Sequence, residues 1–453
     1  MFSIARCNVA LVVITFLCTN VCWGEELRVG VFNVDVSPPV GSPLAYDPCV
    51  EVTDPLTCRG VVIQGAGQPI VLASIDWLGV ANESYSELRQ SIAKSVGTQV
   101  NRVSVHSIHQ HDAPRCDFSA AAILNHYGST HSHYDVAWAR GVFAKIADAA
   151  SKAVADSKVV NAIAVGQATV KEVASNRRML DESGKVFVTR YTACRNPEIR
   201  ALPVGTIDPL LRSITLLNGN QPVAVLTYYA THPQSYYRTG QANPDFPGYA
   251  RNKRELETGI PHIHFNGAGG NIGAGKWNDG AKENRAVLAA KVAQGMRDAY
   301  DTANRQSITV SDVSWKTLAV ALPLGEHLIE KDLVATLNSP TSKETEKLTA
   351  AKHLAWLRRT RAGEQIDIGC LSLGTARVLH LPGELFVEYQ LAASRMRAES
   401  FVAMAAYGEY GPGYIGTEIA YSQGGYETSG RASRVGPSSE TVLMDAMRSL
   451  LQE

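Results

Sequence analysis

The sequence predicts an α/β fold in which mixed β-sheets are layered with helices in a single large domain. Segments with a two-residue hydrophobic period alternate with segments of helical period, which is typical of mixed layers. No Pro-, Gly- or Ser-rich linker divides the 453 residues, so we expect one domain rather than two. Hydrophobic residues make up 45% of the chain and charged residues 19%, which is typical of a globular protein with an extensive core.

Strands are expected where short apolar runs rich in β-branched residues end at polar turns. They cover residues 27–32, 61–63, 70–75, 102–109, 162–173, 212–217, 223–230, 308–322 and, as a strand pair, 371–381. Helices are expected where apolar residues recur every three or four positions over longer stretches. They cover residues 83–96, 136–155, 284–302, 343–361, 384–396 and 438–451.

The first 24 residues have the pattern of a secretory signal peptide. Arg6 gives a positive start, an apolar run extends from Val9 to Leu17, and small and polar residues lead to Gly24. The apolar run is too short to cross a bilayer as a helix, although an uncleaved amino-terminal anchor is an alternative. Cleavage after Gly24 would place residues 25–453 outside the cytoplasm, as a secreted or periplasmic protein.

The charge balance limits the kinds of partner that we expect. Lys+Arg and Asp+Glu both number 43, so the formal net charge is zero. A nucleic-acid or anionic-membrane partner would require a basic surplus that this chain lacks. No later stretch is apolar and long enough for a transmembrane helix, so we expect no integral membrane span after signal cleavage.

Five cysteines follow the expected cleavage site. Export permits disulfides, and Cys49 and Cys58 bracket one short loop, so they are candidates for a pair. Cys116 and Cys194 are candidates for a second pair, which leaves one thiol over. The sequence does not determine the connectivity, and no two cysteines have the C-x-x-C spacing of a structural zinc site.

The densest group of chemically reactive side chains lies at the end of a predicted strand, in the segment Val-His-Ser-Ile-His-Gln-His-Asp of residues 105–112. His109 and His111 are two residues apart, so in an extended chain they share a face. Such a pair can present two imidazoles to a divalent metal, and the alternative is two solvated loop histidines. The neighbouring histidines are interpreted as parts of a polar loop: His126, His131 and His133.

Two more candidate ligands follow predicted strands elsewhere. One strand ends at Ala230 and is followed by His232. Another stops at the turn Pro382-Gly383, which would set Glu384 at the start of a helix. A carboxylate at that position is favoured by the helix dipole and is well placed to ligate a metal. Each residue alone also has an ordinary structural explanation, so their importance depends on convergence with the first pair.

A glycine-rich segment, residues 262–277, suggests nucleotide binding at first sight. Gly270 to Lys276 has the G-x-x-x-x-G-K spacing of a P-loop. However, Trp277 occupies the position of the Ser or Thr that should hold magnesium. We therefore interpret these glycines as residues that let the backbone approach a ligand or a metal centre closely.

Two further segments carry side chains suited to a substrate site. Tyr414 lies in the glycine-rich segment 411–417, and Tyr421 and Tyr426 follow it, which suggests a substrate or metal rim or ordinary loop packing. Arg177, in the run Asn-Arg-Arg after a predicted strand, could bring a cation to an oxyanion. A solvated basic pair is the alternative interpretation.

Taken in order from Asp35 to Pro437, these segments resemble the catalytic domain of the neutral/alkaline (non-lysosomal) ceramidases. Residues 109–114, His-Gln-His-Asp-Ala-Pro, are similar to the H-T-H-S-G-P segment of that family. Residues 382–385, Pro-Gly-Glu-Leu, are similar to its P-G-E-F turn. Five more stretches are similar to family segments in the same order: residues 35–38, 175–178, His232, 244–249 and 414–427.

The resemblance implies a zinc-dependent amidohydrolase that cleaves the N-acyl bond of a ceramide-like small-molecule or lipid substrate with a metal-activated water. It implies that this single domain is catalytic and that Zn²⁺ is held by four side chains: His109, His232, Glu384 and Tyr414. It also implies that three more surround the scissile carbonyl, one as a proton relay and two as oxyanion stabilisers: His111, Arg177 and Tyr426.

Two departures from the family pattern widen the choice of substrate. The family segment G-D-V-S-P-N aligns with residues 270–275, so Gly273 replaces a serine that has an active-site role in ceramidases. The chain also ends soon after the matched region, which predicts that the family's carboxy-terminal β-sandwich domain is missing. A water nucleophile is compatible with Gly273, whereas a serine nucleophile is not. The alternatives are a related metallohydrolase on a non-lipid amide or ester, and a non-catalytic binding protein that retains the fold.

Overall fold

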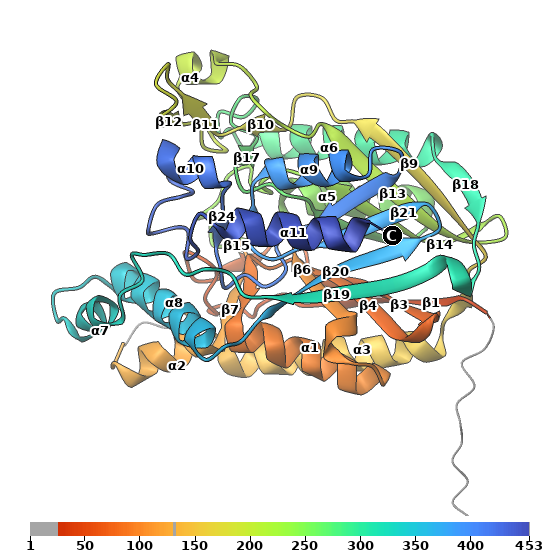
Figure 1. Cartoon of the computed structure of the whole chain (residues 1–453), viewed down its shortest axis with the longest axis horizontal. Helices are drawn as coiled ribbons and strands as arrows, with labels where there is room; N and C mark the ends of the chain where they lie inside the picture. The colour runs from red at the N-terminus through yellow and green to blue at the C-terminus, as the bar shows by residue number, and fades with distance from the viewer. Residues whose placement is uncertain (1–25, 130–132, 453) are drawn as a thin grey trace, which may run out of the picture.

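The computed structural model of the chain describes residues 26–129 and 133–452. Three β-sheets surround one shared apolar core, and a pair of helices covers the outer face of each sheet (Figure 1). The expected signal peptide, residues 1–24, lies outside the described residues, as does His131. Among the helices described, none combines the length and the apolarity needed to span a bilayer.

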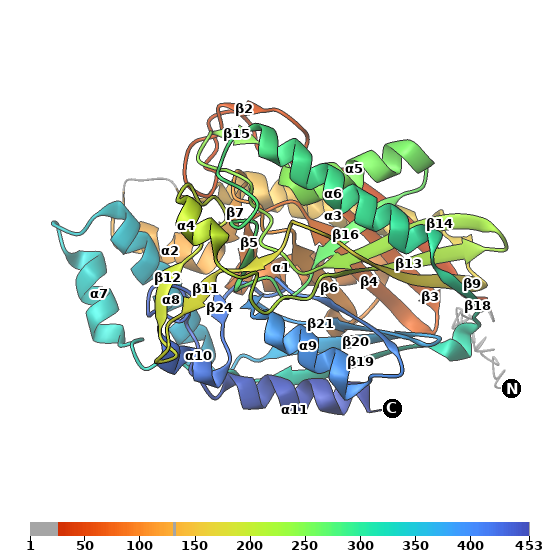
Figure 2. The same cartoon turned by 90° about the horizontal axis from the view of Figure 1, so that it is seen from above.

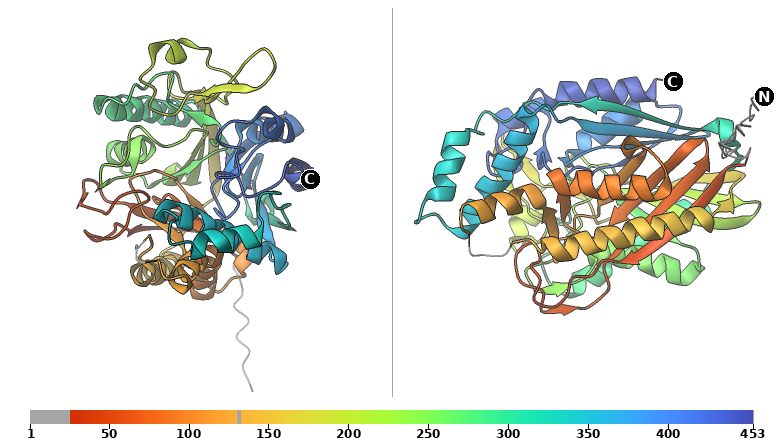
Figure 3. Two further views of the ribbon diagram at one scale, coloured as in Figure 1. Left: turned by 90° about the vertical axis from the view of Figure 1, so that its left-hand side faces the viewer. Right: turned by 90° about the horizontal axis from the view of Figure 1, so that it is seen from below.

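The first sheet is built mainly from the amino-terminal hairpin. Its strands, in spatial order, are β6 (Val103–Ser107), β4 (Gly67–Ile75), β3 (Thr57–Gly65), β1 (Arg28–Asp35) and β8 (Lys158–Val159). β6 runs parallel to β4, and the other neighbours are antiparallel. The helices α1 (Asn82–Val96) and α3 (Val136–Ala155) lie across its outer face (Figure 3, right) because their apolar stripes pack there against the sheet.

The second sheet repeats this plan. Its strands, in spatial order, are β16 (His262–Asn266), β14 (Gln221–Tyr229), β13 (Leu210–Asn218), β9 (Ala162–Thr169) and β18 (Asn304–Ser307). Here β16 runs parallel to β14, and the rest are antiparallel. Figure 2 shows the helices α5 (Asp245–Thr258) and α6 (Glu283–Asp301) above this sheet.

The third sheet comes from the carboxy-terminal part of the chain. Its strands, in spatial order, are β19 (Val313–Val320), β20 (Ile366–Leu373), β21 (Ala376–His380) and β23 (Phe401–Ala405). β21 and β23 are parallel, and α9 (Val387–Met396) and α11 (Ser439–Leu451) cover the outer face. Leu72 of the first sheet, Phe265 of the second and Val378 of the third all belong to the shared core.

Shorter elements gather at one end of the sheets. The helices α2 (Phe118–His126), α7 (Glu330–Asn338) and α8 (Glu344–Arg361) form a group there (Figure 1, left). Loop strands pair as β2 (Glu51–Val52) with β15 (Gln241–Ala242), β5 (Gly79–Ala81) with β7 (Arg115–Asp117), β10 (Ser175–Asn176) with β17 (Ile272–Gly273), β11 (Arg178–Leu180) with β12 (Val186–Thr189), and β22 (Glu384–Leu385) with β24 (Tyr414–Ile415). The short helices α4 (Pro197–Ala201) and α10 (Glu418–Gln423) and the 3₁₀ turns η1 (Val100–Arg102) and η2 (Val310–Asp312) complete the described elements.

The predicted α/β class is confirmed, and the expected strands and helices are present with ends that differ by a few residues. The strand expected from 308 starts only at Val313, because Thr309 and Asp312 form a capping box around η2. The prediction that Glu384 starts a helix is wrong. Glu384 lies in β22, where its backbone pairs with β24, and α9 begins at Val387.

The two suggested cysteine pairs do not form, because all five described cysteines are free and buried. Cys58, on β3, belongs to the core between the first sheet and its helices. The Cys49 thiol donates instead to the carbonyl of Glu51, at 3.5 Å. Cys116 also belongs to that core, whereas the backbone of Cys194 is bonded to Asn278 in a distant loop.

Candidate metal centre

Four of the predicted site residues come from strand ends in three different sheets. His109 and His111 follow β6, His232 follows β14, and Glu384 follows β21. Each of these strands has a parallel neighbour in its sheet, and the three strand ends face one another at the end of the shared core. The carboxyl ends of strands are where α/β folds place their ligands, because loops there carry polar groups past the end of the sheet.

The backbone of His109 turns its ring into the interior. Its φ is +69°, an uncommon value for a residue other than glycine. Bonds from its own N–H to the Trp77 carbonyl (3.0 Å) and from Ile108 to the Ile75 carbonyl (2.8 Å) hold the turn. The predicted convergence of His109 and His111 is confirmed, but a strained turn produces it rather than an extended strand.

His109 and His232 face each other through their Nε2 atoms, which lie 3.2 Å apart. The Nδ1 of His109 lies 2.6 Å from the Leu78 carbonyl oxygen, and that of His232 lies 3.3 Å from the Gly269 carbonyl oxygen. A carbonyl oxygen only accepts, so each ring holds a proton on Nδ1, and the Nε2 atoms are the positions that can offer a lone pair to a metal. Two lone pairs at this separation repel unless a cation lies beside both.

Glu384 completes the same centre. Its Oε2 lies 3.2 Å from the Nε2 of His109 and 3.8 Å from the Nε2 of His232. This oxygen is buried and accepts no hydrogen bond of good geometry from any residue that the structure describes, whereas Oε1 accepts one from the Tyr410 hydroxyl at 2.6 Å. Burial opposes ionisation of Glu384, but His109 and the hydroxyls of Tyr410 and Tyr414 outweigh it, so its pKa lies below the ordinary value.

These donors fit a divalent metal ion. The side chains of His109, His111 and His232 are buried, and their ligand atoms all lie within 4.8 Å of one another. The unsatisfied oxygen of Glu384 would be costly without a cation, because a buried acceptor that bonds nothing loses its solvation. The buried histidine group can therefore hold a metal, with Glu384 beside it.

His111 differs from the other two histidines in its protonation. Its Nε2 lies 3.2 Å from the Nε2 of His232, while its Nδ1 lies 3.1 Å from the Gln234 amide nitrogen and 3.2 Å from the Tyr46 hydroxyl. The amide nitrogen donates, so Nδ1 accepts and the neutral ring carries its proton on Nε2. Burial, together with the neighbouring histidines and arginines, holds the pKa of His111 and of His232 well below the ordinary value, which keeps both rings neutral.

Arg177 and Tyr414 lie against this centre from the other side. Arg177 is buried, donates to the Tyr414 hydroxyl at 3.3 Å and pairs with Glu427 at 3.3 Å. The alternative of a solvated basic pair is wrong, since Arg178 is also buried and lies 3.4 Å from Glu427. Tyr426 packs its ring edge-on to Tyr414, with the centroids 5.7 Å apart.

The glycine-rich loop after β16 brings backbone to the centre, as expected. The Gly269 carbonyl orients His232, and a Cβ on Gly270 would lie 2.3 Å from the backbone oxygen of Glu384. Gly273 lies beside Arg177, where a Cβ would meet the Arg177 Cδ at 3.3 Å. Close packing of the loop on the ligand-bearing strands therefore explains the glycines without a phosphate.

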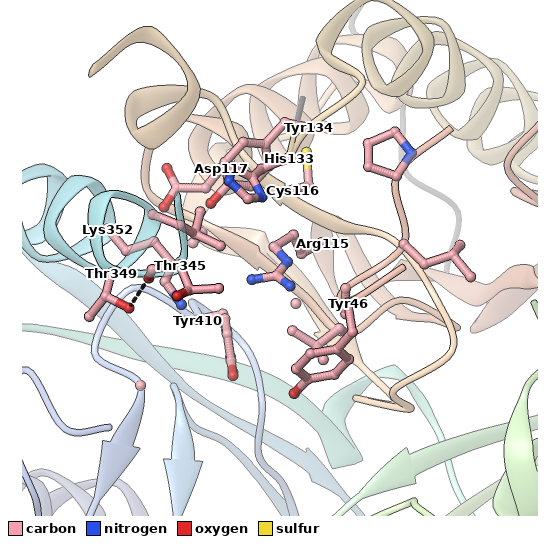
Figure 4. A pocket seen from close by; sticks show the side chains of 18 of the residues that line it. Tyr46, Arg115, Cys116, Asp117, His133, Tyr134, Thr345, Thr349, Lys352 and Tyr410 are labelled. Atoms are coloured by element: carbon pink, nitrogen blue, oxygen red, sulfur yellow. Dashed lines mark hydrogen bonds between the residues drawn. The ribbon is translucent and has the colours of Figure 1, made fainter. Parts of the chain in front are cut away.

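A cavity of about 790 Å³ leads to the centre. Glu384, Tyr414 and Tyr426 are among the residues that line it. Thr345, Thr349 and Lys352 of α8 form one of its walls (Figure 4). Of the remaining sequence candidates, His133 lines the cavity, His126 is exposed at the end of α2, and the Tyr421 hydroxyl contacts Ser433. Five residues of the site were not expected from the sequence: Tyr46, Arg115, Gln234, Lys352 and Tyr410. The only signal in the sequence that could have indicated some of them is their short distance along the chain from the recognised motifs.

The comparison with known proteins shows the fold. The chain matches no protein-family model, and it matches none of the curated proteins in sequence. A solved structure described as a ceramidase complexed with C2 superimposes with a TM-score of 0.67 at 14% identity, covering 94% of this chain and 75% of that one. The neutral ceramidase from Pseudomonas aeruginosa gives a TM-score of 0.66 at 14% identity, with 95% and 75% covered. The chain therefore has a neutral ceramidase-like fold.

Proposed function

We propose that this protein is a zinc-dependent hydrolase that cleaves an amide bond, of the N-acyl, ceramide-like kind, with a metal-activated water. The observation that carries the proposal is the Oε2 of Glu384, which accepts no hydrogen bond of good geometry and lies 3.2 and 3.8 Å from the Nε2 atoms of His109 and His232, in a residue that lines the cavity. The likeness of the fold to two structures described as ceramidases supports the choice of reaction.

The residues proposed to hold Zn²⁺ are His109, His232, Glu384 and Tyr414. Two imidazoles, a carboxylate and a phenol oxygen suit zinc, with room for water. Burial and the Glu384 carboxylate raise the pKa of the Tyr414 phenol well above its ordinary value, so this oxygen would bind through the cation's own charge. When bound, zinc supplies Lewis-acid polarisation of a carbonyl and lowers the pKa of a water molecule to about 7.

Three more side chains are proposed to act on the scissile group. His111 holds a proton on Nε2, and its Nδ1 accepts from Gln234, so it is oriented to transfer a proton toward the leaving group. Arg177 presents a guanidinium fixed by Glu427, which suits an oxygen that gains negative charge. Tyr426 lines the cavity beside Tyr414 and offers a hydroxyl to the same oxygen.

A second candidate function is hydrolysis of a non-lipid amide or ester at the same centre. It is favoured by Gly273, which provides no hydroxyl beside Arg177, and by the charged side chains in the cavity wall. The Glu384 oxygen without a hydrogen bond favours a bound metal, and the cavity that Glu384 lines would give a substrate access to that metal, which a purely binding protein would not require. The donor set therefore favours an enzyme over a binding protein.

Metal analysis of the purified protein tests the proposal. We expect about one zinc per chain, lost in His109→Ala and in Glu384→Gln but kept in the control His126→Ala, which alters an exposed histidine. Wild-type protein that takes up no zinc on reconstitution would disprove the proposed centre. Labelled ceramide assayed beside short-chain N-acyl amides and esters then separates the two substrate classes, because turnover of only the short substrates selects the second.

A further inference from the structure

Five cationic residues line the cavity next to the candidate metal centre, and besides Arg238 and Arg431 they include three from well-separated elements. Arg115 comes from β7, Lys352 from α8, and Arg434 from the segment before α11. Figure 4 shows the Arg115 guanidinium inside the cavity, between Tyr46 and the wall of α8 that carries Lys352. The Arg115 guanidinium carbon lies 5.5 Å from the Tyr46 ring centroid, and Tyr46 in turn contacts His111, which places this charge close to the predicted reaction centre.

These three cations have almost no protein partners. The guanidinium of Arg115 makes no hydrogen bond or ion pair with the described residues, and its Nε is buried without a partner. Lys352 likewise has neither a hydrogen bond nor an ion pair within the described part of the chain. Arg434 donates one bond, to the Gly411 carbonyl at 2.7 Å, and its Nε is also unsatisfied. The buried Nε atoms of Arg115 and Arg434 are costly to leave without a partner, so they indicate a missing acceptor.

Three of the carboxylates that line the cavity already have partners, whereas the Oδ2 of Asp47, which also lines it, is buried and accepts no hydrogen bond from the described residues. Asp117 accepts from the Ala120 backbone and from Asn82, and burial raises its pKa to about 7, so near neutral pH it is only partly charged. Glu344 is bonded by Ser129, and Glu384 belongs to the metal centre. Burial and the nearby Arg434 and Arg115 hold the pKa of Lys352 well below its ordinary value although Asp117 and Glu384 oppose them, and an anion bound beside Lys352 would favour its charged form.

We propose that the cavity binds a negatively charged group of the substrate, a carboxylate, sulfate or phosphate, between Arg115 and Lys352. The proposal deepens the proposed hydrolase function and rests on it for the reaction, but not for the binding of the anion. Arg115 offers a planar set of N–H donors and Lys352 a compact charge, the two side chains that recognise such anions. Tyr410 connects the proposed anion site to the candidate metal centre, because it lines the cavity and its hydroxyl donates to Glu384. The substrate would thus be an acidic N-acyl compound or ester rather than a neutral ceramide.

Direct binding tests the anion site without any hydrolysis. Hexanesulfonate is titrated calorimetrically into the metal-free full-length protein, with hexanol as the neutral comparison. We expect one sulfonate site per chain, with affinity lowered about tenfold or more in Arg115→Met and in Lys352→Met, as for the loss of a charge-assisted bond. The matched control Lys347→Met alters the same helix outside the cavity and should bind as the wild type. Octanoate and octyl phosphate in the same assay identify whether carboxylate or phosphate binds more tightly.

A second measurement links the anion to the reaction. The zinc-loaded wild type is assayed with N-octanoylglycine and N-octanoylglycinamide, which share the acyl chain and the scissile amide and differ in one charge. We expect kcat/KM to favour the glycine compound about tenfold or more, and this preference to disappear in Arg115→Met. Sulfonate binding without any amide turnover would support the anion site and disprove the proposed hydrolase function. Equal turnover of both compounds, or wild-type sulfonate affinity in correctly folded Arg115→Met and Lys352→Met, would overturn the inference.

Discussion

Glu384 and Tyr414 are direct register partners in the parallel pair of β22 and β24. The backbone N–H of Glu384 donates to the Gly413 carbonyl at 2.9 Å. Two residues thirty positions apart in the sequence, 384 and 414, are thus placed together by backbone bonds rather than by long side chains. The glycine before each of them makes this possible, since Gly383 and Gly413 have φ values of +62° and +68°.

Substitution of Gly413 by alanine should disturb this pair. A Cβ there would lie 2.4 Å from the Ala432 backbone oxygen, in addition to the strain of a positive φ. We expect Gly413→Ala to lower the free energy of unfolding by about 2–3 kcal/mol or more, and to reduce zinc occupancy. Urea unfolding and metal analysis measure the two effects. The control Gly363→Ala has a φ of +82° but open space around its Cβ, so only the smaller strain should appear. Equal losses in both variants would contradict the steric explanation.

Loss of Arg177 should impair catalysis without loss of the metal. Its guanidinium contacts the Tyr414 hydroxyl, where the proposed oxyanion would form. We expect Arg177→Met to lower kcat/KM by about 10²-fold, the usual cost of removing one stabilising donor, with zinc content unchanged. Arg178→Met is the matched control, because it breaks a contact to the same Glu427 but faces the Phe386 ring. Similar losses in both variants would show that Glu427 positioning, not the Arg177 charge, matters.

The ion pair of Asp76 and Arg251 should matter for stability. Both side chains are fully buried, and two hydrogen bonds of 2.7 and 2.9 Å join them. Because removal of one partner leaves an unpaired buried charge, we expect Arg251→Met to cost about 3–5 kcal/mol in the free energy of unfolding. The exposed pair of Arg140 and Glu87 is the comparison, and Arg140→Met should cost less than about 1 kcal/mol. The double variant Asp76→Leu with Arg251→Met should recover part of the loss, and a further loss would contradict the explanation.

Asp117 should give stability a distinctive pH dependence. Burial raises its pKa to about 7, above the ordinary value of an aspartate in the unfolded chain, about 3.9. The folded state then binds more protons between these two pH values, so the Asp117 contribution to stability is complete below about pH 4 and is lost as the pH rises through about 7.

We therefore expect Asp117→Asn, which keeps the helix cap of α2, to gain stability relative to the wild type by up to roughly 4 kcal/mol as the pH rises from 4 to 8. Urea unfolding at several pH values gives this difference. The exposed control Asp156→Asn should follow the wild type at every pH. A wild type and an Asp117→Asn variant with parallel pH profiles would rule out the raised pKa.

The fold class was predictable because its signals are local. The hydrophobic period of a strand or a helix is present in each segment by itself, as in the apolar stripe of α3 or the hairpin of β3 and β4. The short-range pair of His109 and His111 was visible for the same reason, although the φ of +69° that directs it was not. The order of the family-like motifs added the distant candidates, which composition and spacing alone leave unconnected.

What only the tertiary structure decided is how residues from three sheets meet. The packing of the strand ends brings His232 to His109, and the β22–β24 pair brings Tyr414 to Glu384, through contacts between segments far apart in the chain. The roles of the three imidazoles follow from carbonyl and amide partners in other loops. Lys352 looks in the sequence like any charged residue of a surface helix. The cavity wall that it shares with Arg115 exists only after folding, because a side chain's partners are set by which distant segments surround it.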